Sequence, residues 1–122
     1  MNEKQISDVI ISCAIDVHKA LGRSQPGIIY RECLFHELAD VGIKVRKEKP
    51  VPVSDEDVKM DFNSRMGLVV EDKVIVELKS AEAMNDVHVA QALSYLKLSD
   101  CKTGLLINFN VTQLTDGIRK YC

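Results

Sequence analysis

The chain has 122 residues, of which 46% are hydrophobic and 28% are charged, and its formal net charge is −2. This length and balance are typical of one globular domain, so we expect residues 1–122 to form a single domain. No run of about 18 apolar residues and no signal-peptide pattern is present, which excludes a membrane-spanning helix and favours a cytoplasmic protein. The net charge gives no general attraction for nucleic acid, although a local basic groove would be enough for binding.

The four cysteines are scattered along the chain, at Cys13, Cys33, Cys101 and Cys122. They form no C-x-x-C pair and no histidine lies at a zinc-ligand spacing, so a zinc site is not predicted. Scattered single cysteines are typical of a reducing compartment. Cys13 and Cys33 are best interpreted as small core residues.

Two helices are predicted first. Apolar residues recur at helical spacing over 3–21, with Asn2 placed to cap the helix and Gly22 to end it. A second helix is predicted over roughly 26–41, where apolar residues again share one face, and Gly42 ends it.

The apolar pattern then becomes alternating, which is typical of strands. In the stretch 43–53, Pro50 and Pro52 remove backbone donors, so this strand is expected at the edge of a sheet. The remaining predictions in this half are a turn at 54–57 and extended chain at 58–62 and 68–70.

The second half predicts a polar turn at 71–73, a strand over 74–79, a helix over 85–98, a buried strand over 103–109 and one short helix over 112–121. The order α-α-β-β-β-α-β-α indicates an α/β fold with a mixed central sheet flanked by helices.

Glu77 and Lys79 interrupt the apolar strand 74–79. Residues two apart on a strand share a face, so a carboxylate and an ammonium lie side by side among apolar neighbours. A salt-bridged pair on an edge strand is one interpretation. The other is hydrolysis of a phosphodiester, where a carboxylate helps to hold Mg²⁺ and a lysine orients water or stabilises developing charge.

His88, Gln91 and Tyr95 are spaced to form one stripe along the helix 85–98. They could be a row of half-buried residues at the boundary of the core. Alternatively, they form a polar row that faces the strand carrying Glu77.

Taken together, several fragments resemble the GxxExxY family, a small bacterial and archaeal group within the PD-(D/E)XK nuclease superfamily. They cover nearly the whole chain and are residues 17–22, 30–38, 70–79, 87–98 and 104–110. The resemblance implies a restriction-endonuclease-like core in which Glu77 and Lys79 are catalytic and Glu77 holds Mg²⁺ or Mn²⁺. The Gln91-x-x-x-Tyr95 pair is similar to the Q-x-x-x-Y motif of recombination-type nucleases, which implies that the row His88, Gln91 and Tyr95 meets nucleic acid.

The chain departs from the family's pattern at two acidic positions. Anchored on Tyr30, the name motif has Ser24 in place of its glycine and Gly27 in place of its glutamate. The family's Arg-Ala-Asp, which precedes the E-x-K strand, reads Arg65-Met66-Gly67 here. Only Glu77 of the expected acidic set remains, so metal binding is expected to be weak or absent.

Asp61, Glu71, Asp72 and Glu32 are not expected to replace the missing acids. Asp61 is six residues from Gly67, roughly 20 Å along an extended chain. Position 67 is expected to face Glu77 only if the loop before the strand has three residues, Glu71 to Lys73.

The sequence therefore predicts a degenerate nuclease-like protein, impaired in catalysis, that binds nucleic acid or a protein partner. Two alternatives stay open. One is an active Mg²⁺-dependent nuclease that hydrolyses phosphodiester bonds, and the other is a small protein-interaction module. The pattern does not specify the substrate or the oligomeric state.

Overall fold

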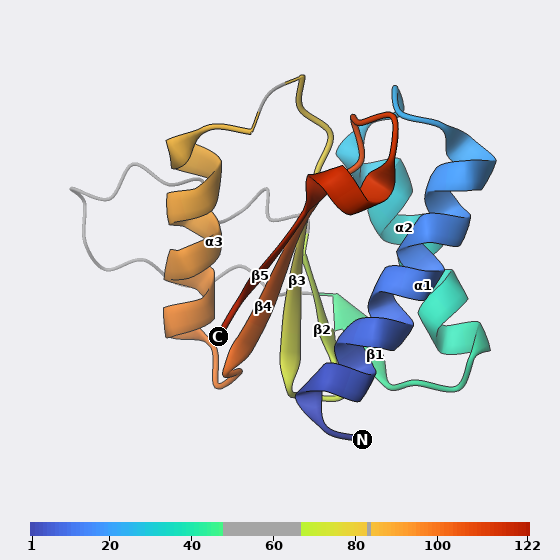
Figure 1. Cartoon of the computed structure of the whole chain (residues 1–122). Coiled ribbons are helices and arrows are strands. Elements are labelled where there is room, and N and C mark those ends of the chain that lie inside the picture. The colour runs from blue at the N-terminus through green and yellow to red at the C-terminus, as the bar shows by residue number, and fades with distance from the viewer. Residues whose placement is uncertain (48–66, 83) are drawn as a thin grey trace.

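The computed structural model describes residues 1–47, 67–82 and 84–122 (Figure 1). In chain order the elements are α1 (Glu3–Leu21), α2 (Gly27–Asp40), β1 (Val45–Lys47), β2 (Gly67–Val70), β3 (Val74–Lys79), α3 (Asp86–Leu98), β4 (Thr103–Asn108), the 3₁₀ helix η2 (Leu114–Gly117) and β5 (Ile118–Tyr121). Within these residues the sheet has five strands in the order β1-β2-β3-β4-β5. Strands β3 and β4 are parallel and the other neighbours are antiparallel, so the predicted mixed sheet is confirmed.

The first helix begins and ends where the sequence predicts. The Asn2 side chain accepts a hydrogen bond from the Gln5 backbone N–H at 2.8 Å, and Gln5 Oε1 accepts one from the Asn2 backbone N–H at 3.0 Å. These bonds satisfy two of the donors that a helix start leaves free. Gly22 ends the helix with a φ of 77°, which favours glycine.

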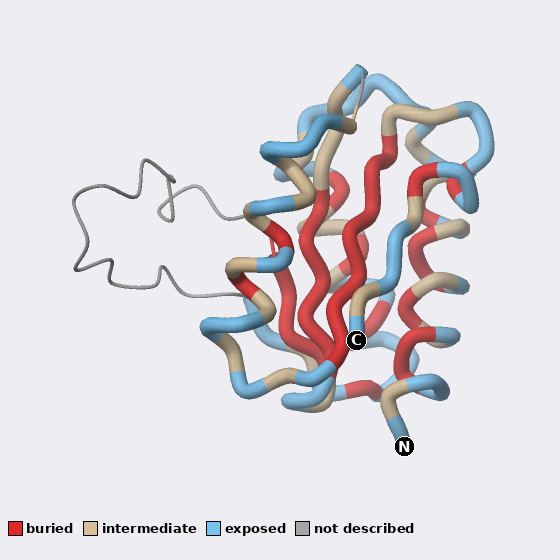
Figure 2. Tube along the Cα trace, turned by 60° about the vertical axis from the view of Figure 1, so that its left-hand side comes forward, coloured by how far each residue is buried: buried red, intermediate tan, exposed pale blue. Residues whose placement is uncertain are grey.

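The sheet separates two layers of helix. In Figure 1, α1 and α2 cover one face of the sheet and α3 covers the other. The main core lies between the sheet and the α1–α2 layer, and the strands at its centre are buried (Figure 2). Its fully buried members include Ile6, Ile10, Leu34, Leu78 and Ile107. Burial of this apolar area is the main term that favours the fold.

A smaller cluster lies under α3, where Tyr95 packs on Val69 and Ile75. Gly104 allows the helix to approach β4, because a Cβ there would lie 3.3 Å from Ile75 Cγ2 and 3.5 Å from Leu96 Cδ1. The face of the sheet that carries Val69 and Ile75 is called the α3 face below.

The predicted helix over 112–121 is wrong. Residues 114–117 form the short η2, and β5 pairs antiparallel with β4 through Leu106↔Arg119 and Ile107↔Ile118. The four-residue spacing of Leu114 and Ile118 imitates a helix. These residues form a strand and not a helix, because the backbone groups on the far edge of buried β4 would otherwise lack hydrogen-bond partners.

Other predictions agree with the described residues. Among the described residues, β1 (Val45–Lys47) lies at the edge of the sheet, as predicted for the stretch 43–53. Residues 48–53 of that stretch, with Pro50 and Pro52, lie outside the described residues. The turn predicted at 54–57 and the extended chain at 58–62 lie outside the described residues. Cys13 is buried and Cys33 packs half-buried against the main core, and none of the four cysteines, all of them described, forms a disulfide. No helix among the described residues is long and apolar enough to cross a membrane.

Candidate functional site

Glu77 and Lys79 lie on the α3 face of β3. Alternation along the strand puts them on the same side as Ile75, which contacts Tyr95 of α3. The Glu77 side chain is 2% exposed, whereas Lys79, the last residue of the strand, is half-buried. The acid therefore lies at the floor of the site and the lysine lies closer to solvent.

Gly67 lies directly opposite Glu77. The β2–β3 connection is a three-residue turn, and its residues Glu71 and Asp72 have positive φ values of 55° and 54°. This turn fixes the register at Gly67↔Glu77 and Val70↔Val74. The loop therefore has the three residues that are needed for position 67 to face Glu77. A side chain at position 67 would have its Cβ about 5 Å from that of Glu77.

The start of α2 lies next to the end of β3. Ser80 Oγ donates a hydrogen bond to the Gln25 carbonyl at 2.6 Å. The buried Tyr30 hydroxyl accepts one from the Gln25 N–H at 3.2 Å and donates one to the Gly22 carbonyl. Gly27 is the first residue of α2, and these contacts hold the segment before it next to the carboxyl end of β3. The contact on the β3 side is Ser80, which follows Glu77 by three residues.

His88 of α3 lies near Lys79. Asn85 caps the helix, and its backbone N–H lies 3.3 Å from His88 Nδ1. Burial lowers the pKa of His88 below its usual range, and the charge of Lys79 lowers it further. The tertiary fold therefore brings His88, the first residue of the predicted polar row, close to Lys79 at this end of α3.

The other two residues of the row differ in depth. Gln91 is half-buried and reaches the surface of α3. Tyr95 is 3% exposed and packs on Val69 and Ile75, farther from the carboxyl end of β3. His88 and Gln91 are therefore partly exposed, while Tyr95 packs between α3 and the sheet.

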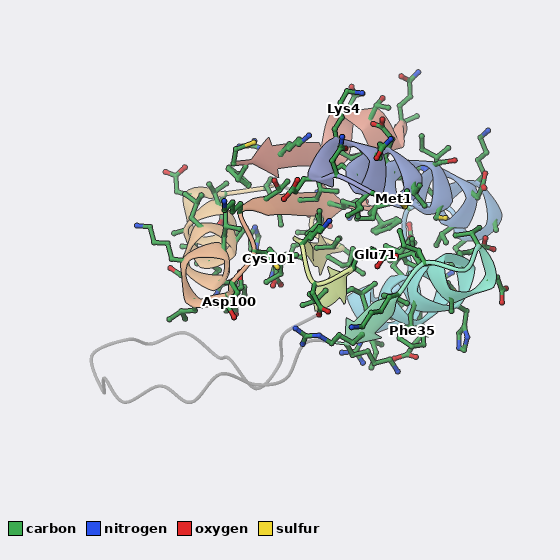
Figure 3. The ribbon with its side chains drawn as sticks, turned by 90° about the horizontal axis from the view of Figure 1, so that it is seen from below. Met1, Lys4, Phe35, Glu71, Asp100 and Cys101 are labelled. Carbon is green, nitrogen blue, oxygen red and sulfur yellow. The ribbon has the colours of Figure 1, made fainter. Side chains whose placement is uncertain are left out.

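Among the described residues, the carboxylates of Glu71, Asp72 and Glu32 do not complete a metal site with Glu77. Glu71 lies at the opposite end of β3 from Lys79, the end that Figure 3 views. Asp72, in the same turn, is 2.7 Å from Lys44 Nζ and 3.3 Å from Arg46 Nε.

Glu32 pairs with Lys47 Nζ at 2.8 Å, and Asp61 lies outside the described residues. Among the described residues no group of three or more His, Cys, Asp or Glu side chains could hold a metal ion. Because Glu77 faces a glycine, it is the one carboxylate that the described residues offer at this place, whereas one or two carboxylates usually hold Mg²⁺ together with phosphate and water.

Sequence reasoning missed Arg119, because the predicted tail helix concealed the register of β5. It gave Asn108 no role, because the partner of its side chain, Ala81, lies 27 residues away in the chain. Asn108 lies beside Lys79 on β4 and is 4% exposed. Its side chain accepts from the Ala81 N–H at 3.0 Å and donates to the Ala81 carbonyl at 3.0 Å, which holds the chain that leaves β3. Strand alternation after Gly117 is the signal that could have indicated Arg119.

A family model of the PD-(D/E)XK nuclease superfamily matches residues 4–121. The chain therefore belongs to the PD-(D/E)XK nuclease superfamily. Its mixed sheet with helices on both faces is the core that the resemblance implied. No curated protein and no solved structure gave a match.

Proposed function

We propose that this chain is a GxxExxY-type, nuclease-like protein with an incomplete metal site, and that it binds nucleic acid at the carboxyl end of β3. The observation that carries the proposal is the register Gly67↔Glu77. It puts a glycine at the place from which a second carboxylate would meet the same metal as Glu77.

Loss of the second acid should reduce nuclease activity more than it reduces the affinity for nucleic acid. Cleavage of a phosphodiester by this class of site requires a divalent cation that neutralises the phosphate and positions water. One buried carboxylate holds Mg²⁺ poorly. Lys79 is present whether or not a metal binds, and a lysine can bind phosphate as a point charge.

The accessible side chains at this end of the sheet suit a phosphate backbone. Lys79 supplies a cation, while His88 and Gln91 supply hydrogen-bonding groups from the facing helix. Glu77 lies below them, so its charge is farther from a ligand at the surface. Binding of this kind depends on salt, because each phosphate contact releases counterions.

The binding proposal is tested with fluorescently labelled single- and double-stranded oligonucleotides at low and rising salt. Lys79→Ala should weaken binding and reduce the slope of log affinity against log salt by about 0.7 to 0.9. Lys73→Ala, in the turn that precedes β3 at its other end, is the matched control and should leave the slope unchanged. Absence of binding to DNA and RNA at low salt would refute nucleic-acid binding and leave a protein partner.

The proposed impairment is tested with the same oligonucleotides in Mg²⁺ and in Mn²⁺. We expect no cleavage above that of a Glu77→Ala variant purified in parallel. Cleavage by the natural chain that disappears in the variant would identify an active metal-dependent nuclease instead.

A further inference from the structure

One row of residues crosses the α3 face from Gly67 to Arg119. The pairs Gly67↔Glu77, Glu77↔Leu106 and Leu106↔Arg119 put the four residues side by side on β2, β3, β4 and β5. Paired residues of neighbouring strands share a face, so Arg119 projects on the same side as Glu77 and Lys79. Two strand spacings separate the Cα atoms of Glu77 and Arg119, which is about 10 Å.

Arg119 also lines a cavity of about 280 Å³ at this end of the sheet. The other walls come from the chain that follows β3, with Glu82 and Met84, and from the chain between β4 and β5, with Val111 and Asp116. The parallel strands β3 and β4 both end here, and the crevice outside the carboxyl ends of parallel strands is where open α/β sheets bind ligands.

The wall of the cavity near Arg119 is held in place by backbone packing. A Cβ at Gly117 would overlap the backbone oxygen of Asn108, so the chain entering β5 passes directly against the end of β4. The buried Asn108 side chain is in turn bonded to Ala81 and to the Asn110 N–H. Gly117 and Asn108 therefore form a part of the cavity wall that backbone packing and hydrogen bonds hold in place.

The Arg119 guanidinium is available to a ligand. It is exposed, and within the described part of the chain it forms no ion pair, although the carboxylates of Glu82 and Asp116 line the same cavity. A guanidinium has the planar fork of donors that matches phosphate oxygens. The two carboxylates would repel phosphate but can accept hydrogen bonds from an amino group of a base, as acidic side chains do from the cytosine N4 amino group.

We propose that this cavity is a nucleotide subsite beside the Glu77–Lys79 site, and this inference rests on the proposed function. Arg119 contacts a phosphate of the strand whose neighbouring phosphate lies at Lys79. The base enters the cavity, where Asp116 and Glu82 accept hydrogen bonds from its exocyclic amino group. A volume of about 280 Å³ is slightly below the roughly 300 Å³ at which ligand pockets usually begin, which suits a single small group. The subsite therefore favours a base with an amino group, such as cytosine, over thymine.

The arginine is tested by comparing Arg119→Ala with Lys120→Ala. Both remove one positive charge from β5, but alternation directs Lys120 to the other face of the sheet. With a short labelled oligo-dC at low salt, Arg119→Ala should weaken binding about ten-fold and Lys120→Ala should not. Equal weakening by the two variants would overturn the subsite. Thermal melts of both variants establish that they fold like the natural chain.

The base contact is tested with oligo-dC and oligo-dT of equal length, because the two carry the same charge. The natural chain should bind oligo-dC at least about five-fold more tightly, and Asp116→Ala should reduce that preference. Equal affinity of the natural chain for the two oligonucleotides would overturn the base assignment.

The outcomes also separate this inference from the function on which it rests. If the natural chain binds and Lys79→Ala weakens binding, but Arg119→Ala behaves like Lys120→Ala, the subsite alone is refuted. If the natural chain binds no oligonucleotide at low salt, the proposed function is refuted and the subsite with it.

Discussion

Restoring the missing acid at position 67 should make the stability of the protein depend on divalent metal. In Gly67→Asp, the new carboxylate would lie directly opposite Glu77, because the two residues are register partners. A second carboxylate beside Glu77 would supply two protein carboxylates, within the one or two that usually hold Mg²⁺. The matched control is Gly67→Asn, which adds a side chain of nearly the same shape without the charge.

The size of the effect follows from the separation of the two side chains. Carboxylates about 5 Å apart repel by about 3 kcal/mol at an effective dielectric constant of about 20. In a chelator, Gly67→Asp should therefore melt about 10 °C below Gly67→Asn, at about 4 °C per kcal/mol. A metal present at about a hundred times its dissociation constant would restore about 2.7 kcal/mol, which is most of the difference.

The assay is thermal unfolding of both variants in EDTA, in Mg²⁺ and in Mn²⁺, followed by titration calorimetry of the metal. We expect the melting temperature of Gly67→Asp to rise with metal and that of Gly67→Asn to stay constant. Adding Gly27→Glu to Gly67→Asp should raise the metal affinity further. If Asp and Asn at position 67 respond alike to metal, position 67 is not the lost acid of the site.

Three other predictions concern stability. Tyr30→Phe should lower the free energy of unfolding by about 1 to 3 kcal/mol in urea titrations, because the Gly22 carbonyl loses its buried donor; an unchanged midpoint would contradict this role for the hydroxyl. Gly117→Ala should cost about 3 kcal/mol, since its Cβ would overlap the Asn108 backbone, and a loss below about 1 kcal/mol would show that β5 can shift. Because the pKa of His88 is lowered in the folded state, the unfolded chain binds its proton first, so stability should fall as the pH drops below about 6.5. In His88→Gln, the free energy of unfolding should fall less between about pH 7.5 and about pH 5.5 than it does in the natural chain. An identical pH dependence of stability in the two proteins would refute this role of His88.

The sequence predicted most elements because their local signals agree with the tertiary structure. Asn2 and Gly22 bound the first helix through capping and a positive φ, which involve residues close in the chain. The alternation around Glu77 and Lys79 likewise survives in β3, because one face of that strand packs on the main core. The prediction for residues 112–121 failed because Leu114 and Ile118 have a helical spacing, while the structure of this segment is decided by pairing with distant β4.

The sequence by itself determined the superfamily, the shared face of Glu77 and Lys79 and the glycines at positions 27 and 67, because these are properties of residue identity and of short-range periodicity. Only the tertiary structure decided that Gly67 lies opposite Glu77, that His88 lies near Lys79 while Tyr95 is buried, and that Arg119 joins the same face. Those relations depend on the length of the β2–β3 turn, on strand register and on the position of α3 on the sheet. Register and helix position involve residues far apart in the chain. No local pattern fixes them, because their energy comes from contacts that exist only after the sheet has formed.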